Sequence, residues 1–449
     1  MAEPIDALHS SFAPGKNTEA AESAGKTHLD AIIVPDAEPL AEEQPAEQGD
    51  IAEHFDELMP AEPPGDSSTA QLINAAGPKT SSAVLDDLVP LPIPLPVDVT
   101  DLDWAAIEAR ALAPDGPKRI SEIVQSLENL LADAHGSLLL FDRDRSDPED
   151  RAIKVSSEPP LWIIGDLHGD LLALEAALAL IRRETEASGE EAGIVFLGDL
   201  IDDGGSGLAL LLRVFDLILG APHRVCLIAG NHDEALSFED GRFTSSVDPS
   251  DFAQFLNEHI DDEWMVRAGR LAIHLFANAP RALFFPGGLL AAHGGFPLID
   301  LHARLSETQD WNDPQVLEDF VWTRAHPRAR KKLPNRYSRG SQFGYQDFAA
   351  FCELSKNLGR PVSHLVRGHD HVDDRFAIYG ADRPNPILTT IALSHRLERE
   401  SGGTYGRVPT IARFVAGAFP QVYRLHIPPA SVQAVYPEHV ASNQEERTP

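Results

Sequence analysis

The sequence is poor in cysteine and in basic residues. Its 449 residues include two cysteines, Cys226 and Cys352, and 37 lysines and arginines against 70 aspartates and glutamates. Two cysteines cannot build a disulfide framework or a cysteine-rich zinc site, so we expect both to lie in the core. The formal net charge of -33 argues against a nucleic-acid-binding protein and against electrostatic docking on anionic lipid. We therefore expect neither nucleic acid nor a membrane among its partners.

Long apolar runs are also missing. No segment approaches the roughly 18 uninterrupted apolar residues that a membrane span needs. Residues 1–6 contain no basic n-region and no apolar h-region of a secretory signal. We expect a soluble protein of a reducing compartment, the cytoplasm. At about 100–200 residues per domain, the length allows two or three domains.

Aromatic residues are scarce in the first 100 residues, which contain only Phe12 and Phe55. The same stretch has 19 acidic residues, three lysines and 13 of the 35 prolines. Such a composition cannot bury enough apolar surface to offset the entropy of ordering the chain. Residues 1–100 are therefore predicted to form a disordered, acidic, Pro-rich tail, which could have a partner of its own.

Proline alternates with aliphatic residues between Val89 and Val97. Proline at every second position removes ladder donors, so this segment is not expected to be a central strand. It is typical of a stiff linker. A polyproline II segment that packs on the next domain, or that a partner recognises, is the alternative.

Apolar periodicity begins after residue 100. Ile120, Ile123, Val124 and Leu127 follow helical spacing, so we expect residues 101–155 to be a helical lead-in. Short apolar runs at 161–164, 194–197 and 225–228 then alternate with helical runs at 171–181 and 208–219, which indicates βαβ units around a buried, parallel or mixed sheet. Further strands are expected at 289–292, 365–366, 387–393, 411–415 and 422–427. The main α/β domain should span 156–430, followed by a C-terminal tail at 431–449.

Potential metal ligands lie next to glycine at the ends of these strands. The motifs are Gly165-Asp166-Leu167-His168-Gly169, Gly198-Asp199, Gly230-Asn231-His232, His293-Gly294-Gly295 and Arg367-Gly368-His369. Carboxyl ends of parallel strands are where open α/β sheets place their sites. Taken singly, each residue would more often be a turn, cap or core residue. Together, Asp, His and Asn donors without thiolate suit Mn, Fe or Zn, and their number exceeds one tetrahedral zinc, so we expect two divalent metal ions.

In this order, the segments GDLHG, GDLIDDG, GNHD, HGG and RGHD resemble the PPP-type, calcineurin-like metallophosphoesterases, the family of the major Ser/Thr protein phosphatases. The resemblance covers about residues 160–400. It implies an α/β fold, namely a four-layer α/β/β/α sandwich of mixed sheets, here preceded by the helical segment and the acidic tail. One departure stands out: Asp203 occupies the place of the arginine in the family's GDxxDRG motif.

The resemblance also implies roles for single residues. Asp166 and His168 would bind the first metal, Asp199 would bridge both metals, and Asn231, His293 and His369 would bind the second. His232 would be the general acid, held by Asp202, and a hydroxide shared by the metals would attack phosphorus in line with the leaving oxygen. Arg339, in a segment that resembles the family's RGxxxxFG, and Arg324, near the family's Trp-Ser-Asp position, would bind phosphate together with Asn231.

The implied function is hydrolysis of phosphomonoesters, with a phosphorylated protein (on Ser/Thr or Tyr) or a small phosphoester as substrate. Two other functions remain open. One is a dinucleoside-polyphosphate hydrolase or another phosphodiesterase, because these relatives share the first three motifs. The other is a non-catalytic phospho-binding module that lost turnover through Asp203.

Overall fold

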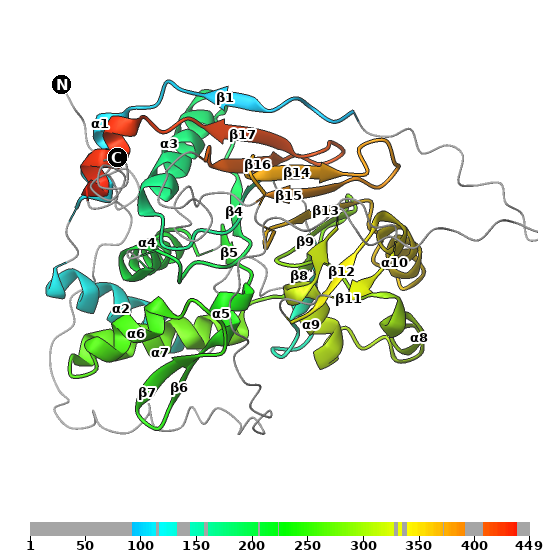
Figure 1. The fold of residues 1–449 in the computed structure, drawn as a ribbon, viewed down its shortest axis with the longest axis horizontal. Helices are drawn as coiled ribbons and strands as arrows, with labels where there is room; N and C mark the ends of the chain where they lie inside the picture. Colours follow the sequence, from blue (N-terminus) through cyan, green and yellow to red (C-terminus); the bar gives the residue numbers. More distant parts are fainter. Residues whose placement is uncertain are drawn as a thin grey trace, which may run out of the picture. The chain divides into compact units, whose positions relative to one another are not determined.

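The structure is a computed structural model that describes residues 92–113, 116–132, 144–156, 160–204, 207–222, 224–326, 331–334, 339–370, 372–390 and 407–437. Within these ranges strands and helices alternate along most of the chain (Figure 1). The strands are β1 (Val97–Val99), β2 (Ala152–Lys154), β3 (Leu161–Ile164), β4 (Gly193–Phe196), β5 (Val225–Leu227), β6 (Leu236–Glu239), β7 (Arg242–Ser245), β8 (Ala282–Phe284), β9 (Leu289–Ala292), β10 (Arg324–Ala325), β11 (Leu333–Pro334), β12 (Ser341–Phe343), β13 (His364–Arg367), β14 (Phe376–Tyr379), β15 (Ile387–Thr390), β16 (Thr410–Phe414) and β17 (Gln421–Leu425). The helices are α1 (Trp104–Ala111), α2 (Pro117–Ala132), α3 (Leu171–Ser188), α4 (Gly207–Gly220), α5 (Asn231–Ala235), α6 (Asp251–Glu258), α7 (Glu263–Asn278), α8 (Ile299–Thr308), α9 (Pro314–Trp322), α10 (Tyr345–Asn357) and α12 (Pro429–Val435).

Two six-stranded sheets form the centre of the fold. The first sheet has the order β1-β17-β16-β3-β4-β5, and the second has the order β14-β15-β13-β9-β8-β2. Both are mixed: β3, β4 and β5 are parallel whereas β16 is antiparallel to β3, and β13 is parallel to β9 whereas β8 is antiparallel to β9. A small sheet of β10, β12 and β11 and the β6–β7 hairpin complete the strands.

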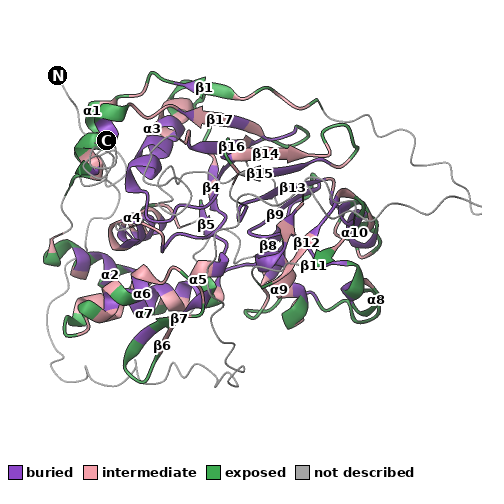
Figure 2. Ribbon diagram, viewed as in Figure 1, coloured by how far each residue is buried: buried purple, intermediate pink, exposed green. Residues whose placement is uncertain are grey.

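Alternating side chains of each strand divide the core into layers. In β3, Leu161 and Ile163 belong to the apolar core between the two sheets, whereas Trp162 and Ile164 face a core that includes α2, α3, α4 and α7. In β9, Leu290 and Ala292 join a third core with α8, α9 and α10. Because strand side chains alternate between faces, these three cores define four layers, helices–sheet–sheet–helices. The predicted four-layer sandwich of mixed sheets is confirmed, and Figure 2 shows its central strands as buried.

The end of the proline-alternating segment, at Leu95 and Val97, contacts the first sheet, so the predicted tail boundary at residue 100 is wrong. Val97–Val99 pairs in parallel with β17, the side chain of Gln421 donates to the carbonyl of Leu95, and Ile93 packs on the core between the sheets. A strand is possible here because β1 lies at the sheet edge. The rest of the predicted tail, residues 1–91, lies outside the described residues.

The other predicted boundaries also shift. Helices α1 and α2 match the expected helical lead-in, but β2 within it pairs with β8 and so belongs to the second sheet. At the other end, α12 extends past residue 430 into the expected C-terminal tail, where Tyr436 is buried. Cys226 and Cys352 are buried, as predicted.

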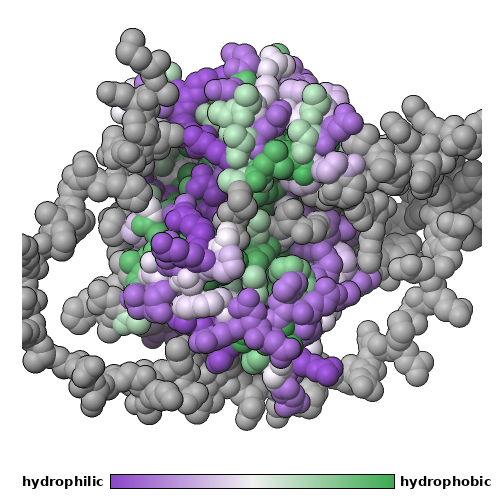
Figure 3. Space-filling model, turned by 90° about the vertical axis from the view of Figure 1, so that its left-hand side faces the viewer, coloured by the Kyte–Doolittle hydropathy of each residue, from purple (hydrophilic) through white to green (hydrophobic). Residues whose placement is uncertain are grey.

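The face on the left of Figure 1, where α1, α2, α4 and α6 lie, carries mostly hydrophilic side chains around a narrower apolar region (Figure 3). Among the helices of the described ranges, none has both the length and the apolar character required to cross a bilayer.

Candidate metal centre

The loops that follow β4 and β5 are in backbone contact, which brings Asp199 and Asn231 close to each other. Gly198 has a φ of +105°, and a Cβ atom on it would lie 2.2 Å from the nitrogen of Gly230. A Cβ on Gly230 would lie 2.2 Å from Oδ1 of Asp199. Only glycine fits these two positions, so the glycines of the two motifs are explained by the close approach of the loops.

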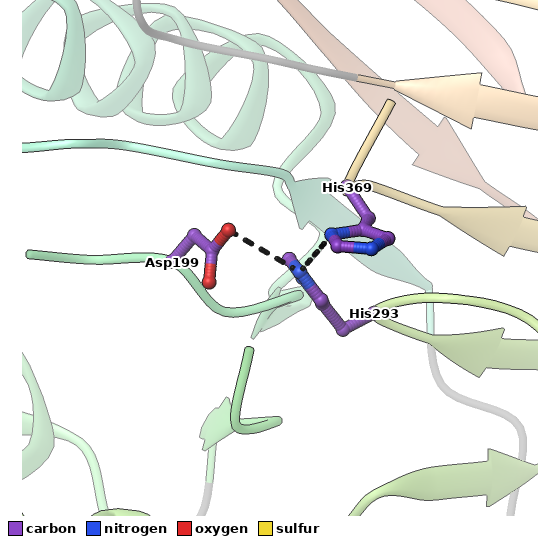
Figure 4. Close-up of side chains that lie close together, drawn as sticks. All are labelled: Asp199, His293 and His369. Atoms are coloured by element: carbon purple, nitrogen blue, oxygen red, sulfur yellow. Dashed lines mark hydrogen bonds and ion pairs between the residues drawn. The ribbon is translucent and has the colours of Figure 1, made fainter. Parts of the chain in front are cut away.

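Four ligand-type atoms converge at the carboxyl ends of β4, β5, β9 and β13. Nε2 of His293 lies 3.3 Å from Oδ2 of Asp199, 3.1 Å from Oδ1 of Asn231 and 3.2 Å from Nδ1 of His369. Figure 4 shows Asp199, His293 and His369 pointing at one another. All four side chains are buried. Oxygen and imidazole donors at these separations form a group that could hold one metal ion.

A second group shares Asp199 with the first. Asp166, His168 and Asp199 are buried, and their ligand atoms lie within 4.8 Å of one another. Oδ2 of Asp199 lies 3.8 Å from Nε2 of His168 as well as 3.3 Å from Nε2 of His293. One carboxylate oxygen thus faces both groups, which is the arrangement expected of a ligand that bridges two metals. The structure brings together all six predicted metal ligands.

Backbone carbonyls orient two of the imidazoles so that Nε2 faces the centre. Nδ1 of His293 lies 2.9 Å from the carbonyl of Leu197, and Nδ1 of His168 lies 3.2 Å from the carbonyl of Ile201. A neutral ring that donates from Nδ1 presents a lone pair at Nε2. The Nε2 lone pair of His293 then faces two oxygens and a nitrogen that also carry lone pairs. A cation between them satisfies all of these atoms, so the donor set fits a divalent metal.

The electrostatics of the centre also favour bound positive charge. Burial raises the pKa of Asp199, but the nearby His293 and His232 outweigh burial and hold this pKa well below its ordinary value. Burial lowers the pKa of His293, but the charge of Asp199 outweighs it and raises this pKa. Burial, followed by the positive charge of Arg324, lowers the pKa of His369 well below its ordinary value. His369 is thereby kept neutral, the form in which imidazole binds metals.

His232 and Asp202 form a hydrogen-bonded pair beside this centre. Nδ1 of His232 lies 3.0 Å from Oδ2 of Asp202, and the backbone N–H of His232 donates to Oδ1 of Asp199 at 2.9 Å. Burial lowers the pKa of His232, but the charge of Asp199 and the hydrogen bond to Asp202 raise it to about 9. The raised pKa favours the protonated ring, which is the form that a proton donor needs.

Two supporting carboxylates were not singled out from the sequence. Asp233 accepts the backbone N–H groups of Asp199 at 2.8 Å, Leu200 at 3.0 Å and Gly230 at 3.0 Å, so it fastens two motif loops together. Asp370 accepts from the buried Arg367 and from the backbone of Ala325 at 2.9 Å. Each follows a predicted ligand or acid by one residue, but the sequence does not show which backbone groups the carboxylates meet.

The two predicted phosphate-binding arginines have different surroundings. Nη1 of Arg324 donates to the carbonyl of His369 and lies 3.5 Å from Asp370, so this arginine is next to a candidate metal ligand. Nε of Arg339 donates to Glu318 at 2.7 Å, and its guanidinium lies 5.0 Å from the ring centroid of Trp322. Both side chains are partly exposed, at 26% and 50%.

Fold and site together define a class of protein. Residues 159–373 match the family model of the calcineurin-like phosphoesterases. This part of the chain is therefore identified as a calcineurin-like metallophosphoesterase domain, a hydrolase domain, as the motifs predict.

The chain is similar to several curated Ser/Thr phosphatases. It is 26% identical over 238 residues to the serine/threonine-protein phosphatase 6 catalytic subunit of Caenorhabditis elegans, a match that covers 52% of this chain and 64% of that protein. It is 23% identical over 234 residues to the serine/threonine-protein phosphatase PP2A-like PPG1 of Candida albicans, covering 50% of each. The chain thus spans half of one relative and just under two thirds of the other. A solved Saccharomyces cerevisiae protein serine/threonine phosphatase with similarity to human phosphatase PP5 aligns with a TM-score of 0.44 and 14% identity, covering 73% of this chain and 92% of that one.

Proposed function

We propose that the protein is a metal-dependent phosphomonoesterase that acts on phosphorylated proteins. The observation that carries this proposal is the position of Oδ2 of Asp199, 3.3 Å from Nε2 of His293 and 3.8 Å from Nε2 of His168. In this proposal Asp166, His168 and Asp199 hold one divalent ion, and Asp199, Asn231, His293 and His369 hold the other. Two such ions lower the pKa of a shared water and neutralise charge on phosphoryl oxygens.

The chain's own groups then bind phosphate and handle the proton. His232, whose Nδ1 is occupied by Asp202, presents Nε2 to the leaving oxygen and donates its proton there. Asn231, Arg324 and Arg339 bind the phosphoryl oxygens; a guanidinium suits this task because its planar fork matches two oxygens at once. The relatives' names support a phosphoprotein as substrate.

A substrate panel tests the proposal. With Mn²⁺ present, we expect turnover of p-nitrophenyl phosphate and of a phosphoserine or phosphotyrosine peptide, and much slower turnover of bis-p-nitrophenyl phosphate and of a dinucleoside tetraphosphate. Faster turnover of either diester-type substrate would instead indicate a phosphodiesterase. Peptide binding without any turnover would indicate a binding module.

The arginines are tested separately. Arg324→Ala and Arg339→Ala should each raise KM for p-nitrophenyl phosphate by about tenfold, the effect of losing a charged contact worth about 1.5 kcal/mol. Arg304→Ala is the matched control, because Arg304 is also partly exposed and pairs with a carboxylate, that of Asp313, the N-cap residue of α9. If KM is unchanged in both variants, these arginines do not bind the phosphate.

A further inference from the structure

The turn that carries Asp202 has an unusual backbone. Asp199, Asp202 and Asp203 have φ angles of +51°, +63° and +57°. Non-glycine residues pay for such left-handed conformations in free energy and keep them only where surrounding groups fix them. Asp233 fixes the start of the turn through the N–H groups of Asp199 and Leu200.

Helix α6 fixes the end of the turn through two hydrogen bonds: it accepts one from the turn and donates one to it. Oδ1 of Asp251, the first residue of α6, accepts the backbone N–H of Asp203 at 2.8 Å. The backbone N–H of Phe252 donates to Oδ1 of Asp202 at 3.0 Å, while Oδ2 of Asp202 faces His232 at 3.0 Å. The two oxygens of Asp202 therefore join α6 to the imidazole of His232.

Helix α6 is in turn held by its own neighbours. It belongs to the segment between β5 and β8, together with the β6–β7 hairpin and α7, and these elements lie together in Figure 1. The side chain of Asn257 in α6 both accepts the N–H of Phe243 at 2.9 Å and donates to its carbonyl at 2.7 Å. The ring of Phe243 packs so closely on α7 that a Cβ at Gly269 would lie 2.6 Å from it. The position of α6 is thus set by its contacts with β7 as well as by its contacts with the turn.

We propose that Asp251 is a positioning residue for the proton donor: by holding the Asp202–Asp203 turn against α6, it keeps the Asp202 carboxylate oriented toward His232. This inference rests on the proposed role of His232 as general acid. Asp251 touches neither a candidate metal ligand nor the site of phosphate in this scheme. Its effect should therefore be confined to the step in which the leaving oxygen is protonated.

Leaving-group dependence tests the inference. p-Nitrophenolate hardly needs a proton to leave, whereas a serine alkoxide does. Asp251→Ala should slow kcat on a phosphoserine peptide at least tenfold more than kcat on p-nitrophenyl phosphate, with both metals still bound. Asp251→Asn, which retains an oxygen to accept the N–H of Asp203, should restore most of the peptide rate.

Two controls separate the possible causes. Asp262→Ala removes the N-cap carboxylate of α7, which accepts from Trp264 and Met265 and does not contact the turn, so it should lower the melting temperature without selective loss on the peptide. His232→Ala, measured in parallel, should give a larger selective loss. If His232→Ala shows selectivity and Asp251→Ala slows both substrates equally or neither, the positioning role is wrong. If His232→Ala itself shows no selectivity, the proposed general acid is wrong.

Discussion

Asp202 is the residue whose charge is most directly linked to the protonation of His232. Its carboxylate lies 3.0 Å from Nδ1 of His232 and, with Asp199, raises the pKa of that ring to about 9 in spite of burial. A raised pKa means that the ring keeps its proton to higher pH. Cations held at the proposed metal centre would offset the charge of Asp199, which would leave Asp202 as the main negative group beside His232.

The pH dependence of turnover should follow this pairing. Activity that needs protonated His232 is full at low pH and is lost as pH rises through the ring's pKa. Asp202→Asn removes the negative partner and lowers that pKa, so the alkaline limb of kcat for an alkyl phosphate should move down by about one pH unit or more. The profile for p-nitrophenyl phosphate serves as control and should move little. An alkyl-phosphate limb that stays in place would show that Asp202 does not set the proton affinity of the acid.

Helix α9 contains a carboxyl group whose burial should make stability depend on pH. Asp319 accepts the backbone N–H of Leu298 at 2.8 Å, and burial raises its pKa to about 7. Between the ordinary value near 4 and about 7, the folded protein holds a proton on Asp319 that the unfolded chain has lost. Asp319 therefore lowers stability as pH rises through this window, and its effect is constant above it.

Asp319→Asn should remove this dependence. The amide oxygen can still accept the N–H of Leu298, but the side chain no longer ionises. The melting temperature of the variant minus that of the wild type should increase from pH 4 to pH 7 and then level off, reaching several degrees. A difference in melting temperature that does not change with pH across this window would mean that Asp319 has an ordinary pKa in the folded protein.

The residues just before β1 show how proline can be compatible with a sheet edge. The carbonyls of Leu95 and Val99 face β17, where they accept from Gln421 and His426. Because successive residues of an extended strand point their backbone groups to opposite sides, the nitrogens of Pro94 and Pro96 face the open edge. No ladder donor is lost on the paired side, and the open edge offers fewer donors to another chain.

Truncation should separate the stabilising part of the N-terminal region from the rest. Removing residues 1–91 should change the melting temperature little, because their composition buries little apolar surface. Removing residues 1–100 also deletes β1 and the contact of Ile93 with the core, so it should lower the melting temperature by several degrees. Equal melting temperatures for the two truncations, measured by calorimetry, would mean that β1 does not stabilise the sheet.

At the scale of the whole molecule, the sequence predicted the layers and the residues that meet at the candidate metal centre, but not the elements that support them. Buried strands such as β3 and β4 are short apolar runs followed by glycine and a candidate ligand, so both the strands and the place of these candidate ligands could be predicted. The role of β6, β7 and α6 could not be predicted, because it depends on contacts with residues some 50 positions away, such as Phe252 with Asp202. Strand β1 was missed because the effect of the prolines that precede it depends on which side of the strand β17 occupies.

The phosphate-binding residues remain predictions for a related reason. Short motifs identify Arg324 and Arg339, but the orientation of a long side chain depends on its neighbours, and Arg339 pairs with Glu318. Asp203, in the place of the family arginine, makes a backbone contact with Asp251 that no motif describes.

The central claim is that Asp199 joins two metal ions in a hydrolytic site. Its most direct test is the metal stoichiometry of purified wild-type protein and of Asp199→Asn, measured together with turnover of p-nitrophenyl phosphate. We expect two divalent ions per chain and turnover in the wild type. The variant should lose at least one ion and most of its activity. An Asp199→Asn variant that keeps two ions and full turnover would contradict the account.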